Sequence, residues 1–150
     1  MTFTGGCLCG DVRYECEEES GGGHCHCIDC RKSSGTGHCS HMIVPESAFK
    51  VNGKLKFFDK PADSGHIISR GFCPNCGSPI YSRNSSTPGT IFVRASSLDD
   101  PEAFKPQMVV YTDRAASWDH MDPSLPRFAA MPAPKEMPEG LGPVAPQQSA

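Results

Sequence analysis

Phe72-Cys73-Pro74-Asn75-Cys76-Gly77 is the stretch of sequence that we expect to decide the fold. Two residues separate its cysteines, a spacing that lets both sulfur atoms face one metal ion while backbone N–H groups of the turn donate to the thiolates. A second pair, Cys7 and Cys9, lies near the N-terminus. On an extended strand, residues i and i+2 point to the same side, so these two thiols can also reach one ion.

We therefore predict a closed zinc site made of Cys7, Cys9, Cys73 and Cys76. Such a site would tie the first strand to the second half of the domain, and the metal would contribute folding free energy directly. The competing interpretations are a redox C-x-x-C motif and unrelated free thiols. A redox motif usually precedes a helix within a βαβ unit, which the sequence does not indicate here.

Composition limits the classes of function. The chain has 150 residues, the size of one domain, with 14 Lys+Arg against 17 Asp+Glu and nine cysteines. No basic stripe could follow a phosphate backbone and no apolar run could span a bilayer, so we expect neither nucleic-acid nor membrane partners. The first residues lack the features of a signal peptide, so we expect a cytoplasmic protein whose cysteines serve metal or redox chemistry.

The distribution of short β-branched and aromatic segments predicts a mainly β fold with few helical turns. Gly, Pro, Asn or Ser separates nearly every pair of segments. We predict one helical turn at residues 31–35 that is stopped by Gly35. We predict strands at residues 11–16, 37–44, 55–59, 66–72, 79–83, 90–96 and 108–112, and a polar loop that ends in three glycines at residues 17–23.

The C-terminal end differs in composition from the rest. Residues 131–150 contain five of the 14 prolines and no aromatic residue. Such a segment buries too little apolar surface to offset its ordering entropy. We therefore predict one zinc-binding domain at residues 1–130 and a Pro/Ala-rich disordered tail at 131–150.

A second cysteine cluster, Cys25-His26-Cys27-Ile28-Asp29-Cys30, puts three thiols into six residues. Three protein ligands plus one exchangeable position distinguish a catalytic zinc ion from a structural one. An open ion could bind an incoming thiol as thiolate or polarise a carbonyl oxygen. Arg31 and Lys32 follow directly, and could lower thiol pKa values and hold the carboxylates of an acidic substrate.

The residues alone leave this second site open to two interpretations. His24, His26, Cys39 or a cysteine from another chain could complete the ligand shell and make the site purely structural. His26 lies between two of the ligands and is expected to point away from the metal. Arg31 and Lys32 could equally be part of a solvated turn.

With both clusters placed, the chain resembles the glutathione-dependent formaldehyde-activating enzyme (GFA) family, also called the CENP-V/GFA domain. The resemblance runs from about residue 3 to residue 128. It rests on Gly5-Gly6-Cys7-Leu8-Cys9-Gly10, on Cys25-His26-Cys27-Ile28-Asp29-Cys30-Arg31-Lys32, on Arg70-Gly71-Phe72-Cys73-Pro74-Asn75-Cys76-Gly77-Ser78, and on residues 95–101 and 125–128. Ala116-Ser117-Trp118 stands where the family usually has Ala-Pro-Trp.

The resemblance implies an Mss4-like fold of short antiparallel β-sheets stapled by two zinc ions. It implies that Cys7, Cys9, Cys73 and Cys76 bind a structural ion, and that Cys25, Cys27 and Cys30 bind a catalytic ion. The activity it implies is that of a carbon–sulfur lyase, which joins glutathione to formaldehyde as S-(hydroxymethyl)glutathione. The sequence around the central cluster departs from that of the namesake enzymes, so the exact reaction is not carried over.

Three hypotheses follow. The first is a zinc-dependent carbon–sulfur lyase acting on the adduct of glutathione or another thiol with formaldehyde or a related aldehyde, as a monomer or homodimer. Its site could be lined by His38, His41, Phe72 and Trp118. The second is a non-catalytic zinc-binding structural or interaction module of the same fold. The third, a methionine sulfoxide reductase, needs a reactive thiol outside both sites, and only Cys16 and Cys39 remain for that role.

Overall fold

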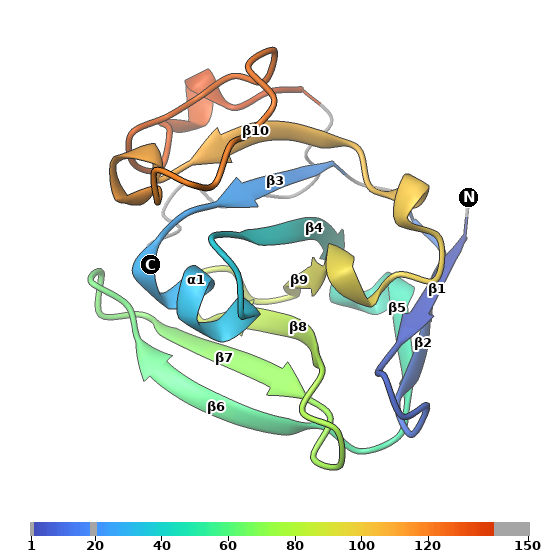
Figure 1. Ribbon diagram of the computed structural model, residues 1–150. Coiled ribbons are helices and arrows are strands. Elements are labelled where there is room, and N and C mark those ends of the chain that lie inside the picture. The colour runs from blue at the N-terminus through green and yellow to red at the C-terminus, as the bar shows by residue number, and fades with distance from the viewer. Residues whose placement is uncertain (1, 19–20, 140–150) are drawn as a thin grey trace.

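The computed structural model describes residues 2–18 and 21–139, and within them the fold is mainly β, as predicted. Strands form two sheets, one with the order β1-β2-β5 and one with the order β10-β3-β4-β9-β8-β7-β6 (Figure 1). All pairs are antiparallel except β10 with β3, which is parallel. The strands are β1 (Phe3–Gly6), β2 (Arg13–Cys16), β3 (Gly22–Cys25), β4 (Cys39–Pro45), β5 (Phe49–Asn52), β6 (Lys56–Pro61), β7 (Ile67–Phe72), β8 (Pro79–Asn84), β9 (Thr90–Arg94) and β10 (Pro106–Val110).

Helical structure is limited to one short α-helix and single turns among the described residues. The α-helix, α1, spans Ile28–Ser34 and lies against β4. The 3-10 turns are η1 (Glu46–Ala48), η2 (Ala95–Ser97), η3 (Pro101–Ala103), η4 (Thr112–Arg114) and η5 (Pro134–Glu136). Gly35 ends α1 as predicted, but the helix begins at residue 28 and not at 31. The start of α1 could not be recognised from the sequence, because its N-cap is Cys27 and not one of the usual Ser, Thr, Asp or Asn residues.

Three strands were not predicted from the sequence: β1, β3 and β5. β3 contains Gly22 and Gly23, which suggested a loop. In the structure a Cβ atom at Gly22 would lie 1.7 Å from the carbonyl oxygen of His41 on β4. The glycine run therefore lets β3 fit between β4 and β10, so the prediction of a loop through residue 23 was wrong.

The seven-stranded sheet has two faces with different roles. One face packs against the three-stranded sheet through Met42, Val44, Ile80, Ile91 and Val93, which meet Val12 and Tyr14. Side chains alternate along a strand, so the intervening residues of β4 and β9 point to the opposite face. That face carries Cys39, Ile43 and Phe92, which group with Met108 and Val110 of β10 in a second core. Strand pairing thus separates a structural face from the face that holds the three-cysteine cluster.

The predicted four-cysteine group is assembled between the two sheets. Cys7 and Cys9 follow β1, and Cys73 and Cys76 lie in the connection from β7 to β8; their four sulfur atoms all lie within 4.8 Å of one another. The Sγ atoms of Cys7 and Cys9 are 3.6 Å apart, and those of Cys9 and Cys73 are 3.7 Å apart. Sulfur atoms at the corners of a tetrahedral zinc site are about 3.8 Å apart. The spacing therefore fits one zinc ion.

Hydrogen-bond donors surround these thiols. The backbone N–H of Val12 donates to Cys7 Sγ at 3.2 Å, and the hydroxyl of Ser78 lies 3.2 Å from Cys76 Sγ. The hydrogen bond with Ser78 lowers the pKa of Cys76 to about 5, which favours the thiolate form that a metal requires. Ser78 also accepts a hydrogen bond from the backbone N–H of Leu8, so the two cysteine pairs are joined by protein contacts as well.

The segment after β10 packs back on the second core. Arg127 forms an isolated parallel β-bridge with Val109 of β10. Met131 and Met137 pack against the second core. The boundary predicted at residue 130, between a zinc-binding domain and a disordered tail, stays a prediction. Residues 140–150 of the expected tail lie outside the described residues. No helix in the described ranges is long and apolar enough to cross a membrane.

We predict that the four-cysteine group is required for stability. Cys76→Ser should lower the bound zinc from two ions per chain to one and lower Tm by more than about 10 °C, because metal binding here is folding free energy. Native mass spectrometry and calorimetry provide the readouts. Cys16→Ser is the matched control, because Cys16 is buried but belongs to neither thiol group. An unchanged zinc count in Cys76→Ser would contradict the prediction.

A surface ion pair gives a second prediction, on pH dependence. Arg13 Nη1 donates to Asp99 Oδ1 at 2.8 Å and Thr4 Oγ1 donates to Oδ2 at 2.7 Å. The hydrogen bond from Arg13, aided by Thr4, lowers the pKa of Asp99 from 3.8 to about 2. A pKa lowered in the folded state adds stability above the unfolded value, and this stability is lost as pH falls toward 2.

Asp99→Asn should accordingly lower Tm by about 1–3 °C at pH 7, a small effect because the pair is exposed to solvent. The difference from the unsubstituted chain should shrink as pH falls from 4 toward the pKa of about 2. Calorimetry over this range is the measurement, with Asp113→Asn as the control for removing an exposed carboxylate. A difference that stays constant with pH would refute the linkage to Asp99.

Candidate functional site

The three central thiols come together at the junction of β3 and α1. Cys25 ends β3, Cys27 caps α1, and Cys30 lies in its first turn, with the three sulfur atoms all within 4.8 Å of one another. The helical turn places residues i and i+3 side by side, and the backbone N–H of Cys30 donates to Cys27 Sγ at 3.2 Å. Cys27 is fully buried, and Cys25 and Cys30 are 9% and 8% exposed.

A cavity of about 90 Å³ opens beside this group on the concave face of the seven-stranded sheet. Strand register explains part of its lining: Gly23 lies opposite His41, and Ile43 lies opposite Phe92. The remaining walls come from both ends of the sheet. They include Ile68, Arg70, Ser82, Arg83, Asn84, Met108, Val110, Tyr111 and Met131, together with the three thiols.

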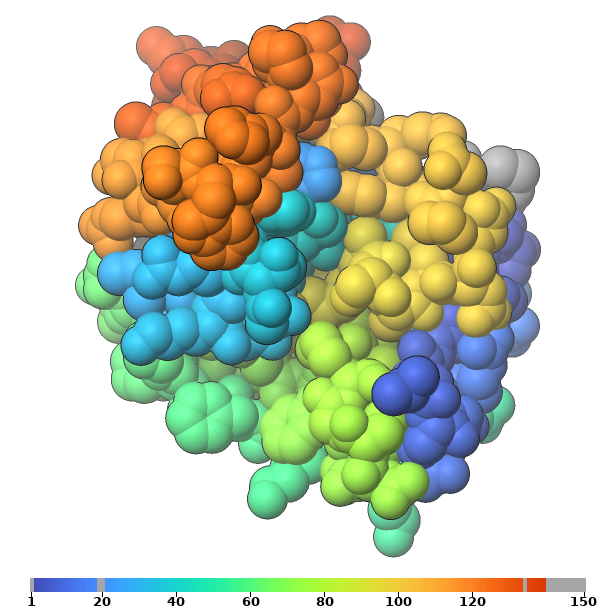
Figure 2. Space-filling model, viewed as in Figure 1, coloured from blue at the N-terminus to red at the C-terminus, as the bar shows by residue number. Residues whose placement is uncertain are grey.

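Figure 2 shows that the α1 segment, in blue and cyan, reaches the surface on this face. It lies between the orange segment that follows β10 and the green strands β6 and β7. The contact with β6 is an ion pair, in which Lys60 Nζ lies 2.7 Å from an oxygen of Asp29. Two distant parts of the chain therefore flank the helix that presents Cys30.

Two further residues of β4 lie next to Cys30 and form a separate group with it: Cys39 and His41. His41 Nε2 is 3.6 Å from Cys30 Sγ. Neither residue belongs to the group of the three central thiols. His24, another ligand considered from the sequence, is hydrogen-bonded through Nδ1 to Ser40 Oγ at 2.8 Å. From the sequence we considered Cys39 as a fourth ligand but not His41, because only the register of β4 brings His41 beside the thiols.

The chemistry of the three thiols suits a cation. Hydrogen bonds from Cys25 and then Cys27 lower the pKa of Cys30 to about 5. Hydrogen bonds to Cys27 and Cys30 raise the pKa of Cys25 well above its usual 9.0. Without a bound cation, one of the three thiols therefore ionises readily, and its negative charge makes ionisation of the others unfavourable. A divalent cation removes this conflict, because it binds thiolates and deprotonates coordinating thiols.

A buried arginine supports an anionic cluster at the same place. Arg94 lies opposite His41 in the β4–β9 ladder and is only 3% exposed. Its Nη2 donates to Ser33 Oγ at 3.0 Å, and no carboxylate of the described residues pairs with it. Burial would raise the pKa of Cys39, but its hydrogen bond with Cys30 and the charge of Arg94 lower it. Three thiolates around one divalent ion leave one excess negative charge, which Arg94 can balance.

Two more arginines line the cavity, and their situations differ. The guanidinium of Arg83 donates to Glu46 and lies 5.2 Å from the ring centres of Phe57 and Tyr81. Arg70 makes no ion pair with any described residue, so its guanidinium is available to the cavity. The sequence did not identify Arg70, because its position depends on the pairing of β7 with β8, where it lies opposite Ser82.

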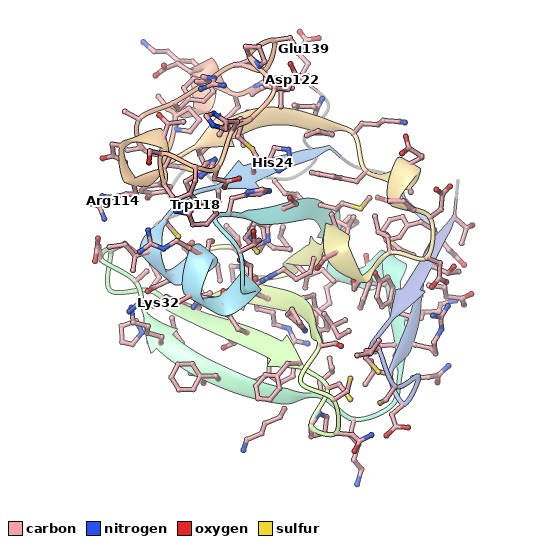
Figure 3. All side chains as sticks on the ribbon, viewed as in Figure 1. His24, Lys32, Arg114, Trp118, Asp122 and Glu139 are labelled. Carbon is pink, nitrogen blue, oxygen red and sulfur yellow. The ribbon has the colours of Figure 1, made fainter. Side chains whose placement is uncertain are left out.

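The predicted anion-binding residues lie elsewhere. Arg31 is half-buried and Lys32 is exposed on α1, and neither lines the cavity. Figure 3 shows Lys32 on the α1 side of the molecule, well apart from His24. Of the other residues expected to line the site, His41 does so, whereas His38, Phe72 and Trp118 do not. Trp118 is 65% exposed.

Similarity to known proteins identifies the family of this chain. The family described as glutathione-dependent formaldehyde-activating enzyme (GFA) matches residues 2–114. No curated protein matches the chain. The crystal structure of a Rhodobacter sphaeroides protein, a structural genomics target, is similar with a TM-score of 0.53 and 21% identity, over 66% of this chain and 92% of that chain. At this identity the likeness concerns the fold alone. The family match spans most of the chain, which therefore belongs to the glutathione-dependent formaldehyde-activating enzyme family.

Proposed function

We propose that the chain is a zinc-dependent carbon–sulfur lyase that acts on the adduct of a thiol, such as glutathione, with formaldehyde or a related small aldehyde. The observation that carries the proposal is the open group of Cys25, Cys27 and Cys30 beside a cavity. Three thiols without a fourth ligand in the same group leave one position for a substrate atom. A zinc ion held there would stabilise a thiolate at neutral pH and act as a Lewis acid toward oxygen.

The size of the cavity favours a small aldehyde. A volume of about 90 Å³ holds several water molecules, which is room enough for formaldehyde or a related small aldehyde beside the thiols. The thiol end of glutathione would enter here, while its backbone and carboxylates would stay at the mouth. Phe92, Met108 and Val110 give the interior an apolar wall, which limits competing water near the reacting carbon.

The reaction requires one proton transfer. A sulfur–carbon bond forms, the carbon–oxygen π bond opens, and the thiol proton passes to the oxygen that becomes the hydroxyl. His41 Nε2, which is 3.6 Å from Cys30 Sγ, is the proposed proton carrier. The ring is fixed against Phe92 by an edge contact with centres 6.2 Å apart. The reverse reaction uses the same groups in the opposite order.

Charges at the site favour a thiol that carries carboxylates. We propose that Arg70 holds one carboxylate at the cavity, because it has no carboxylate partner among the described residues. Arg31 and Lys32 would add a weaker and longer-range attraction from α1. The positive charges of these side chains would also favour the thiolate form of the incoming substrate.

The alternative is a non-catalytic zinc module, which the position of Cys39 and His41 keeps open. Both lie near Cys30, so either could complete a closed shell after a small shift. A closed site would hold zinc tightly and bind no thiol. The next experiment separates these two functions.

Exchange NMR of glutathione with formaldehyde tests the proposed reaction. The zinc-loaded protein should accelerate formation of S-(hydroxymethyl)glutathione in proportion to its concentration, and Cys25→Ser should abolish the acceleration. Cys16→Ser should retain it, because Cys16 lies outside both thiol groups. Exchange at the uncatalysed rate with protein that holds two zinc ions would refute the lyase and favour the module.

Arg70→Gln tests the substrate class. It should raise the KM for glutathione about tenfold with little change in kcat, the effect of losing one charge-assisted contact. The KM for a thiol without carboxylates, such as 2-mercaptoethanol, should not change. Lys32→Gln is the comparison variant, and it should raise the KM for glutathione by a smaller factor that disappears at high salt. An equal rise in KM for both thiols in Arg70→Gln would rule out a carboxylate-binding role.

A further inference from the structure

One group of metal-ligating side chains contains no cysteine: His26, His38 and Asp119. Asp119 Oδ2 is 2.7 Å from His38 Nδ1 and 3.5 Å from His26 Nδ1. His26 and Asp119 are almost enclosed, with side chains 1% and 12% exposed, and the side chain of His38 is 19% exposed. The three residues come from the loop after β3, the residue before β4, and the segment after β10, so tertiary structure brings them together.

His26 presents an unpartnered ring nitrogen to Asp119. Its Nδ1 is buried and has no hydrogen-bond partner among the described residues. It lies 3.5 Å from the carboxylate oxygen of Asp119, which is longer than an N–H···O hydrogen bond. A buried polar atom without a partner is unfavourable, and a cation bound by both the ring nitrogen and the carboxylate would satisfy it.

The surroundings hold the three side chains in place. A Cβ atom at Gly37 would lie 2.4 Å from Asp119 Oδ2, so the glycine makes room for the carboxylate against the backbone. The ring of His24 packs edge-on against His38 with centres 5.0 Å apart, and Ser40 fixes His24.

We propose that His26, His38 and Asp119 bind a divalent transition-metal ion of the zinc class. Nitrogen and oxygen ligands at about 2.1 Å from such an ion stand about 3.0–3.4 Å apart. The observed 3.5 Å and 2.7 Å reach that range by shifts of a few tenths of an ångström. The ion would tie the segment after β10 to the loop that carries Cys25 and Cys27. Figure 3 shows the neighbouring Trp118 between His24 and Lys32 in this view.

Metal titration of the zinc-loaded full chain, followed by native mass spectrometry, tests the proposal. A third zinc ion should bind after the two cysteine sites are filled, and a mild chelator should remove it first, since its ligands are not thiolates. His38→Ala and Asp119→Asn should weaken this third step at least about tenfold and leave the first two unchanged. His120→Ala is the matched control, because His120 is an exposed histidine next to Asp119.

Cobalt titration of the unsubstituted zinc-loaded chain gives an independent readout that does not depend on how the variants fold. The added Co²⁺ should show only weak visible bands, without new thiolate-to-cobalt charge transfer, because nitrogen and oxygen ligate it. Absence of a third metal ion in the unsubstituted chain would overturn the proposal. A third ion that is retained in both variants, or that acquires thiolate bands, would also overturn it.

Discussion

The interaction on which the rest of this structure depends is the meeting of two cysteine pairs between the sheets. Cys7 and Cys9 lie in the turn between β1 and β2 of the small sheet, while Cys73 and Cys76 lie in the connection from β7 to β8. Their sulfur atoms converge to distances that suit one tetrahedral ion. The core between the sheets is modest, with Met42, Ile80 and Ile91 as its largest fully buried apolar side chains. A metal ion bound by these four thiols would cross-link the two sheets at this seam and fix the orientation of the large sheet, and with it the concave face.

That orientation is what gives the second cysteine group its surroundings. Alternation along β4 and β9 directs Met42 and Val93 into the core and directs His41 and Arg94 to the other side. The same sheet therefore packs in the core with one face and carries the proposed site on the other. Arg94 is buried where an anionic thiolate cluster would otherwise lack compensation. The cavity results from the register of strands that are far apart in the sequence.

The sequence predicted those parts of the protein that depend on local spacing. Both thiol groups, the strands rich in β-branched residues and the end of α1 at Gly35 could be identified because close neighbours encode them. β3 could not be identified from the sequence, because its glycines suit a strand only when β4 and β10 lie alongside. Arg70 was missed as a cavity residue, and His41 as a possible ligand beside Cys30, for the same reason: strand pairing decides which face they occupy. The cluster of Asp119 with two histidines depends on long-range contacts and leaves no pattern in the sequence.

The parallel pairing of β10 with β3 has a consequence for the order of folding. The three central thiols lie within one short segment and can gather as soon as α1 forms. One wall of their cavity, Met108 and Val110, belongs to a strand about 85 residues further along, and parallel pairing over such a separation forms slowly. During synthesis the thiols are therefore grouped while the cavity is still open on one side. The chain has an interval in which a metal ion can reach the cluster from solvent before β10 closes over it.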